Sequence, residues 1–410
     1  MAISTNNEQP WLHVIGVGES GLKSLDSEAL KVLENSEIII GGERHHNLTK
    51  GFQAKRIKWP SPFSTMVGKL GEFRPKMVAI LVTGDPLWYS AGALLAKEWP
   101  QEEIRFYPQL SAFQLACSRM SWSIPDVDKL TVHGRPVEQI IPWFSPYNKI
   151  VVLTADAQSP RIIADLLVKK GYGLSKMIVL GEMGGSNETL IHGQADIWEQ
   201  TEGNCPIPEF HTLCIECIPS GKEAILPPPP GLPDNAFVSD GNFTKKEVRS
   251  LTVSSLNPGK NKILWDLGCG SGSIGIEWLQ LSFNGKAFGV ERNPLRCEMA
   301  QNNALKLGSP RFAIICGRSL DTINTLPDPD SVFIGGGLDL ELVEQALHRL
   351  KPYGCLVANT VTLESEAVLG DLQKKFGGEL TKIAISRSRT IGKLTTWDQL
   401  LPVTQWRLQK

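Results

Sequence analysis

The 410-residue sequence has no excess of either sign of charge, no long apolar run and no apolar core near its start. Forty-two basic residues stand against 43 acidic ones, which gives a formal net charge of −1. This balance argues against general nucleic-acid binding, although a local basic patch remains compatible with it. No run approaches the length of a membrane span, and the polar residues 1–10 lack the apolar core of a signal peptide. We therefore expect a cytoplasmic protein with neither a nucleic-acid nor a membrane partner.

Cysteines are also sparse, with eight scattered through regular-looking segments, and this pattern favours reduced thiols in a chain of this length. Cys214 and Cys217, with His211 and Cys205 nearby, have spacing compatible with half of a zinc site. A second ligand pair is missing, and the residues lie in a strand-like run over 210–218. We predict no metal site.

The most informative stretch that is present is residues 262–277, with the sequence KILWDLGCGSGSIGIE. The apolar run 263–267 suits a strand covered on both faces, and helical spacing resumes after the glycines. Between them, Gly268, Gly270 and Gly272 allow a sharp turn and a close approach of the backbone to a ligand. A glycine turn that leads into a helix N-terminus suits a ligand carrying phosphate or carboxylate.

Two ligand classes compete for this turn. A dinucleotide fingerprint has the pattern GxGxxG, whereas Ser273 occupies its third glycine position here. The spacing present, DxGxGxG, resembles the first motif of class I S-adenosylmethionine (SAM) methyltransferases. Residues 286–291 predict the next strand, which ends in Glu291, where an acid can accept hydrogen bonds from both ribose hydroxyls. The alternative is a structural turn whose glycines serve packing only.

Four consecutive prolines at 227–230 divide the chain. They cannot continue a helix or a central strand, and their extended geometry makes a semi-rigid spacer. We predict an N-terminal domain over 1–220, a proline-rich linker over 221–235 and a C-terminal domain over 236–410, because each half is large enough for its own core. A proline-rich ligand for a recognition module is the alternative for the run.

Strand and helix signals alternate in both halves, which predicts an α/β fold. The N-terminal half has strand or helix signals at 11–18, 25–33, 37–40, 76–83, 104–107, 110–120, 149–154, 160–169 and 176–181. The C-terminal half opens with a capping-box pattern at 244–247, ahead of a helix through 256. Its later signals, at 294–307, 312–316, 331–335, 340–350 and 354–359, have the rhythm of a doubly wound sheet. Strands near 383–386 and 394–397 fit an antiparallel hairpin that closes such a sheet.

Five motifs in the N-terminal half occur in a characteristic order: Gly16-Val17-Gly18, Gly41-Gly42-x-Arg44-His45, Thr83-Gly84-Asp85-Pro86-Leu87-x-Tyr89, Gln109-Leu110-Ser111-Ala112 and His133-Gly134-Arg135-Pro136. Together they resemble the tetrapyrrole methylases, in the branch that methylates precorrins. The resemblance covers about residues 11–218 and implies a tetrapyrrole-methylase-like α/β region.

The C-terminal half resembles the decarboxylating precorrin methyltransferases, a Rossmann-like class I SAM methyltransferase fold. The motifs are Phe243-Thr244-Lys245-x-Glu247-Val248-Arg249, Phe333-Ile334-Gly335-Gly336-Gly337 and Ala358-Asn359-Thr360-Val361-Thr362-Leu363-Glu364. The two halves in this order resemble the bifunctional enzymes of cobalamin synthesis. That resemblance implies methylation of a precorrin at C5 and C15 with loss of CO₂ from an acetate side chain, SAM as cofactor, a tetrapyrrole partner and a homo-oligomer.

The resemblance also implies site residues, although none is assigned a catalytic role. In the C-terminal half the implied SAM contacts are Asp266, Gly268, Cys269, Gly270, Ser271, Gly272, Glu291, Gly317 and Thr244. The alternative role for Thr244 is that of a helix N-cap without a ligand contact. In the N-terminal half the implied SAM contacts are Gly84, Asp85 and Pro86, with Val17, Ser111 and Ala112. Four cations are expected to bind the carboxylates of the substrate: Lys245, Arg249, Arg44 and Arg135. The alternative for each is a solvated or ion-paired charge on the surface. His45 and His133 are candidates for proton handling or for structural roles.

Two other functions stay open at this point. One is a SAM methyltransferase that acts on another small molecule or on nucleic acid; the near-neutral charge and the absence of an N/D-P-P-Y tetrapeptide speak against the nucleic-acid version. The other is a protein whose N-terminal half has no catalytic activity and only binds the tetrapyrrole, which it delivers to an active C-terminal half.

Overall fold

The structure is a computed structural model that describes residues 10–60, 62–221 and 225–410. Residues 1–9, where we expect no signal peptide, and 222–224 of the predicted linker lie outside the described residues. Internal contacts divide the chain into two units. The first holds the described residues up to Arg135 together with Pro146–Ser220, and the second holds Pro136–Ser145 with the described residues from Gly221 to Lys410. Each unit is described by itself.

The first unit begins with a five-stranded parallel sheet in the order β3-β2-β4-β1-β5. Its central strands are runs of Val, Ile and Leu that are buried on both faces, as a parallel sheet covered by helices requires. The strands are β1 (Leu12–Val17), β2 (Ile38–Gly41), β3 (Lys55–Lys58), β4 (Val78–Thr83) and β5 (Ile104–Tyr107). The accompanying helices are α1 (Ser27–Asn35), α2 (Glu43–Leu48), α3 (Ser64–Val67) and α4 (Gly92–Glu98).

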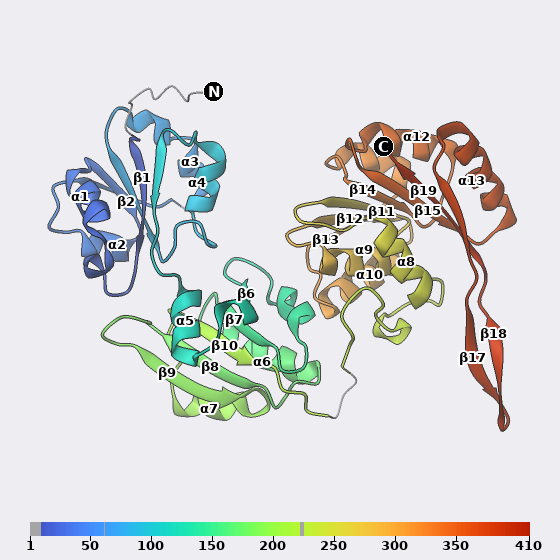
Figure 1. The fold of residues 1–410 in the computed structure, drawn as a ribbon, viewed down its shortest axis with the longest axis horizontal. Coiled ribbons are helices and arrows are strands. Elements are labelled where there is room, and N and C mark those ends of the chain that lie inside the picture. The colour runs from blue at the N-terminus through green and yellow to red at the C-terminus, as the bar shows by residue number, and fades with distance from the viewer. Residues whose placement is uncertain (1–9, 61, 222–224) are drawn as a thin grey trace. The chain divides into compact units, whose positions relative to one another are not determined.

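A second five-stranded sheet of this unit has the order β6-β7-β10-β8-β9 and is antiparallel except for the β6–β7 pair (Figure 1). Its strands are β6 (Asp128–Thr131), β7 (Lys149–Leu153), β8 (Lys176–Gly181), β9 (Thr189–Gln194) and β10 (His211–Glu216). Its helices are α5 (Ala112–Met120), α6 (Ser159–Lys169) and α7 (Trp198–Asn204). Cys214 and Cys217 are fully buried within and just after β10.

The second unit is built on a seven-stranded sheet in the order β13-β12-β11-β14-β15-β19-β16. The first five strands are parallel, and β19 and β16 are antiparallel additions. The strands are β11 (Ile263–Leu267), β12 (Lys286–Glu291), β13 (Phe312–Cys316), β14 (Ser331–Ile334), β15 (Cys355–Thr360), β16 (Glu379–Ile383) and β19 (Val403–Gln409). The helices are α8 (Lys246–Ser255), α9 (Ser273–Leu281), α10 (Pro294–Lys306), α11 (Ser319–Thr322), α12 (Leu340–Arg349) and α13 (Leu363–Phe376).

Both faces of this sheet are covered. Leu264 packs into a core cluster with residues of α8, α9 and α10, whereas its neighbour Trp265 packs into a second cluster with residues of α12 and α13. Alternate residues of a strand point to opposite faces, so a strand buried on both sides is apolar at nearly every position, and in β11 the exception is Asp266. The α/β prediction is confirmed for both units, and β13 has the predicted bounds.

Two predictions for the C-terminal half are wrong. The strands that complete the large sheet are β16 and β19, whereas β17 (Ser386–Ile391) and β18 (Leu394–Gln399) pair only with each other and form a hairpin that extends away from the sheet (Figure 1). The capping box at 244–247 also does not form, because α8 begins at Lys246 and its N-cap is Lys245, which makes no side-chain cap. In the described part of the chain, no helix combines the length and apolarity that a membrane span needs.

Candidate functional site

The glycine turn of the second unit joins the carboxyl end of β11 to α9. Gly268, Gly270 and Gly272 have φ values of 71°, 55° and 81°, which side chains with a Cβ rarely adopt. A Cβ on Gly268 would also lie 2.8 Å from the backbone nitrogen of Gly336, in the loop after β14. The glycines are therefore required for the backbone conformation itself and for the close contact between two loops.

Glu291 ends β12 beside this turn and is 6 % exposed. Its carboxylate accepts hydrogen bonds from the amides of Gly270 (3.0 Å) and Asn293 (2.9 Å). Its carbonyl accepts one from the amide of Gly317 (2.9 Å), the residue after β13. Three neighbouring strand ends thus present the predicted turn, acid and glycine together, at the edge where open α/β sheets bind ligands.

Asp266 anchors the turn from inside the sheet. It is fully buried, and its Oδ2 accepts a hydrogen bond from the amide of Gly275 in α9 (2.9 Å). Burial raises the pKa of this carboxyl to about 7; the Gly275 bond opposes the rise and the charge of Glu291 adds to it. The Oδ1 of Asp266 and the buried hydroxyl of Ser271 have no hydrogen-bond partner among the described residues.

These features fit a polar nucleoside ligand such as SAM. Gly270 leaves room at the turn, and the carboxylate beside it keeps acceptor capacity for hydroxyl groups because each oxygen accepts only one amide. Unpartnered buried polar atoms are rare in proteins, and two of them occur at this turn. Cys269 is buried, and burial raises the pKa of its thiol well above the ordinary value, which disfavours the thiolate form.

Thr244 and Lys245 lie on the segment that precedes α8. The carbonyl of Thr244 accepts a hydrogen bond from Arg249 (2.7 Å). The ammonium of Lys245 lies 3.2 Å from the carbonyl of Gly241 and 4.3 Å from the centre of the Phe243 ring. Both residues remain only partly buried, as a contact with a ligand requires.

Arg249, a predicted contact for substrate carboxylates, has a different role. Its side chain is 0 % exposed, and its Nε donates to the equally buried Glu277 at 2.6 Å. The remaining donors go to Asp234 and to the carbonyls of Thr244 and Leu232. The guanidinium is therefore occupied within the chain, and the prediction is corrected to a structural ion pair.

In the first unit the predicted residues gather at the carboxyl ends of β4, β1 and β5, which are adjacent in the sheet. The amide of Gly84 donates to the carbonyl of Val17 (3.1 Å). A Cβ on Gly84 would lie 3.6 Å from the Cα of Ser111, and a Cβ on Gly16 would lie 2.3 Å from the carbonyl oxygen of Gly84. The close approach explains why Gly16 lacks a side chain, whereas Gly84 has room for a Cβ but has a φ of 67°, which favours glycine.

The other predicted SAM contacts of this unit flank the same meeting point. Asp85 accepts a hydrogen bond from the amide of Leu87 (2.8 Å), and Pro86 is buried. Ala112 is the first residue of α5, whose N-cap Ser111 accepts from the amide of Gln114 (3.3 Å). The Ser111 hydroxyl is already occupied in this capping box, because it also donates to the side-chain oxygen Oε1 of Gln114 at 3.0 Å.

The two predicted cations of the first unit are partly exposed and make intramolecular contacts. Arg44 pairs with Glu19 and lies 5.3 Å from the centre of the Phe210 ring. Arg135 lies over the ring of Tyr89 at 5.5 Å and is otherwise exposed. An exposed guanidinium over an aromatic ring keeps donors for a substrate carboxylate.

His45 is a buried, neutral histidine beside these loops. Its Nδ1 lies 3.3 Å from the amide of Gly42, and its Nε2 lies 3.4 Å from the hydroxyl of Thr83. Burial, then the positive charges of Arg44 and His46, lower its pKa to about 4. His133, by contrast, is exposed.

The lowered pKa of His45 predicts a loss of stability in acid. Because the folded value lies below the unfolded one, the stabilisation is complete above about pH 6.5 and is lost as the pH falls towards about 4. We expect the free energy of unfolding to drop by about 2–3 kcal/mol over this window through His45 alone. Denaturant unfolding of the wild type and His45→Gln at several pH values measures this difference. Parallel pH profiles for the two proteins would contradict the prediction.

Sequence reasoning missed three residues near the C-terminal turn. Gly336 approaches Gly268, and the carbonyl of Asn242 lies 4.0 Å from the place of a Cβ on Gly270. Asn303, fully buried in α10, bonds to the carbonyl of Ser271 at 3.0 Å. For Gly336 the glycine run at 335–337 was a signal in the sequence. Nothing in the local sequence distinguishes Asn242 or Asn303 from other asparagines.

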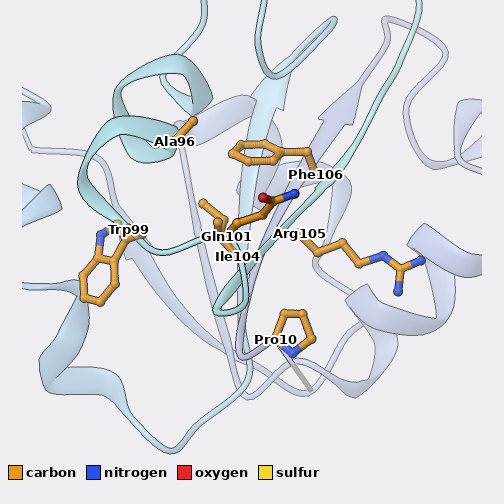
Figure 2. Close-up of a pocket in the computed structure, with 7 residues that line it drawn as sticks. All are labelled: Pro10, Ala96, Trp99, Gln101, Ile104, Arg105 and Phe106. Atoms are coloured by element: carbon orange, nitrogen blue, oxygen red, sulfur yellow. The ribbon is translucent and has the colours of Figure 1, made fainter. Parts of the chain in front are cut away.

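A separate pocket lies at the opposite edge of the N-terminal parallel sheet. Its lining includes Pro10, just before β1, and Ile104, the first residue of β5 (Figure 2). These are the amino ends of parallel strands, whereas the glycine loops follow the carboxyl ends. The pocket, whose lining is completed by Ala96, Trp99, Gln101, Arg105 and Phe106, is therefore not the site built by the predicted residues.

Comparison with known proteins agrees with this arrangement. Residues 11–197 match the tetrapyrrole (corrin/porphyrin) methylases, and residues 235–410 match the precorrin methyltransferase domain. A Sinorhizobium protein named precorrin-6Y C(5,15)-methyltransferase [decarboxylating] is 37 % identical over 419 residues, which cover 100 % of both chains.

Shorter relatives match less than half of the chain. A Pyrobaculum aerophilum protein named probable cobalt-precorrin-6B C(15)-methyltransferase (decarboxylating) is 34 % identical, over 42 % of this chain and 93 % of its own. A Salmonella typhimurium protein named cobalt-precorrin-7 C(5)-methyltransferase is 28 % identical, over 44 % of this chain and 89 % of its own.

Fold and matches together define a tetrapyrrole methylase joined to a precorrin methyltransferase domain. The chain belongs to the precorrin-6Y C(5,15)-methyltransferase (decarboxylating) family.

Proposed function

We propose that this chain uses SAM to methylate precorrin-6Y at C5 and C15 and removes CO₂ from an acetate side chain, as a step of cobalamin synthesis. The observation that carries the proposal is the full-length similarity to the Sinorhizobium protein of that name. The glycine turn beside Glu291 supports SAM as the methyl donor, because it leaves room for a nucleoside and places a carboxylate next to it.

The proposed division of labour assigns C15 methylation and decarboxylation to the C-terminal half and C5 methylation to the N-terminal half. The names of the shorter Pyrobaculum and Salmonella relatives support two separable activities. We retain residues 1–220 as the tetrapyrrole methylase domain, 221–235 as the linker and 236–410 as the methyltransferase domain. The two family matches, at 11–197 and 235–410, support this division.

SAM supplies an electrophilic methyl group, and a reduced tetrapyrrole offers electron-rich carbons, so the chain needs little activation of a nucleophile. Its contribution is to align the reacting atoms and to exclude water. Glu291 holds the turn and keeps lone pairs for ribose hydroxyls, while Asp266 fixes α9 to β11. Decarboxylation uses the conjugated imine of the macrocycle as electron sink and requires no metal.

The substrate carboxylates need cations at the mouth of each site. Lys245 in the C-terminal half and Arg44 and Arg135 in the N-terminal half remain the proposed contacts, since each is partly exposed. We also propose a cytoplasmic homo-oligomer without a nucleic-acid or membrane partner. The formal charge of −1 supports the absence of general nucleic-acid binding.

Mass spectrometry of precorrin-6Y incubated with the purified chain and methyl-labelled SAM tests the proposal. We expect two labelled methyl groups and the loss of one CO₂. A chain that binds SAM but leaves the substrate unchanged, while a reference enzyme converts the same batch, would show that the substrate is a different one. Parallel incubation with the cobalt-containing substrate distinguishes the two forms of the macrocycle.

A further inference from the structure

One segment of the second unit, residues 236–245, runs from a short 3-10 turn at Asp234–Ala236 to the start of α8 and is named here the strap. It has no strand pairing, yet its backbone reaches the glycine turn, because the Asn242 carbonyl lies 4.0 Å from the place of a Cβ on Gly270. The strap also carries Thr244 and Lys245, both predicted for the site. Its position relative to the turn therefore decides whether they can reach a ligand.

Asn303 of α10 fixes that position. Its Oδ1 accepts a hydrogen bond from the amide of Val238 (2.9 Å), and its Nδ2 donates to the carbonyl of the same residue (2.8 Å). The same Nδ2 donates to the carbonyl of Ser271 in the glycine turn (3.0 Å). One fully buried amide group thus holds the strap and the turn together, and only asparagine has this donor and acceptor set at this length.

Two further contacts from α10 support the strap. Lys306 donates to the carbonyl of Ala236 (2.9 Å), and Arg296 pairs with Asp240 (2.6 Å) in a partly exposed ion pair. Arg296, Asn303 and Lys306 occur at i, i+7 and i+10 and so lie along one side of the helix. The Asn303 side chain is fully buried and its bond to Ser271 is a buried one, whereas the Arg296–Asp240 pair is partly exposed. Hydrogen bonds of a buried amide contribute more to order than an exposed ion pair does.

We propose that the strap forms one wall of the SAM site in the C-terminal half, and that Asn303 is the positioning residue that sets this wall against the glycine turn. The inference rests on the proposed function of the same site. Asn303 acts through the backbones of Val238 and Ser271 and does not touch the reacting atoms.

Hydrogen exchange of the wild-type chain with and without SAM is the first test. We expect SAM to slow exchange of the amides of the glycine turn, residues 268–275, and of the strap, residues 236–245, in parallel. Protection of the turn without protection of the strap would overturn the strap proposal while leaving SAM binding intact. No protection at either segment, together with no SAM binding, would instead remove the proposed function.

A variant tests Asn303 itself. Asn303→Leu keeps the number and branching of the side-chain heavy atoms and removes all three bonds, and we expect it to raise the KM for SAM in the decarboxylating methylation at least tenfold with a smaller change in kcat. Thr252→Val is the matched control, because it removes buried polar contacts in α8 to Val248, Asn359 and Gln405 without touching the strap. It should lower the melting temperature but leave KM within about twofold. An unchanged KM in a folded Asn303→Leu would contradict the proposal. If that variant does not fold, the same KM measurement on Asn303→Asp decides, because this variant keeps the acceptor for Val238 and loses both donated bonds.

Discussion

Replacing Arg249 by methionine is expected to lower the free energy of unfolding of the second unit by about 3–5 kcal/mol. Arg249 and Glu277 are both 0 % exposed, and their Nε–Oε1 distance is 2.6 Å. Removing the cation leaves the carboxylate of Glu277 buried without its partner, which costs more than the attraction within the pair contributes. Denaturant unfolding of the full chain, followed by a probe in the second unit, measures the change.

The surroundings of the pair explain why the effect should be large. Glu277 also accepts hydrogen bonds from the amides of Gly231 (2.6 Å) and Leu232 (3.1 Å), so it fastens the end of the proline-rich segment to α9. Arg249 lies over the ring of Phe237 at 4.7 Å. The loss therefore affects α8, α9 and the segment that leads into the strap.

Two further variants make this prediction specific. The double variant Arg249→Met, Glu277→Gln should be less destabilised than the single one, because a neutral amide leaves no unpaired charge and its single oxygen still accepts from one of the two backbone amides. Lys374→Met breaks an ion pair whose side chains are 78 % and 79 % exposed, and it should change stability by less than about 0.5 kcal/mol. A loss below about 1 kcal/mol in Arg249→Met would restore a surface or substrate-binding role for this residue.

The corrected role of Arg249 shows which kind of contact the sequence could not predict. Its motif indicated an arginine near the substrate, but the sequence does not reveal that Glu277, 28 positions later, is buried beside it. The same limit applies to Asn303, whose partners lie 65 and 32 positions away. Pairings of this kind depend on how helices pack against one another, which local sequence patterns do not predict.

Local patterns were sufficient where the backbone itself imposes the residue type. The positive φ values of Gly268, Gly270 and Gly272 permit few alternatives to glycine, and the buried strand β11 and the edge strand β13 follow directly from apolar runs. Thr244 shows the opposite case. A capping-box pattern was present, but the bond from Arg249 holds its carbonyl and α8 starts two residues later. The amide of Lys246, the first residue of α8, instead donates to the carboxylate of Asp234 at 2.9 Å, so a side chain 12 positions away replaces the local cap.

The largest effect on activity is expected from placing a methyl group at either glycine loop. Gly268→Ala would put a Cβ 2.8 Å from the Gly336 nitrogen at a φ of 71°, and Gly16→Ala would put one 2.3 Å from the Gly84 carbonyl oxygen. A shift of about 1 Å in a positioned group can cost about 10²-fold in rate. Under the proposed function, Gly268→Ala should therefore lose decarboxylation and one methylation by at least about 100-fold, and Gly16→Ala the other methylation.

An assay of the two variant proteins mixed together distinguishes the loss of a site from an obligatory order of the two methylations. If one methylation must precede the other, a single variant can lose both products, yet the mixture should restore both because each chain supplies the site that the other lacks.

Gly370→Ala and Gly68→Ala are the controls, since a Cβ at either position has nothing within 4 Å and neither has a positive φ. Both controls should keep full activity, with the methyl groups counted by mass spectrometry. A mixture that stays inactive while both proteins are folded would contradict one site in each half, because independent sites in separate chains must complement each other.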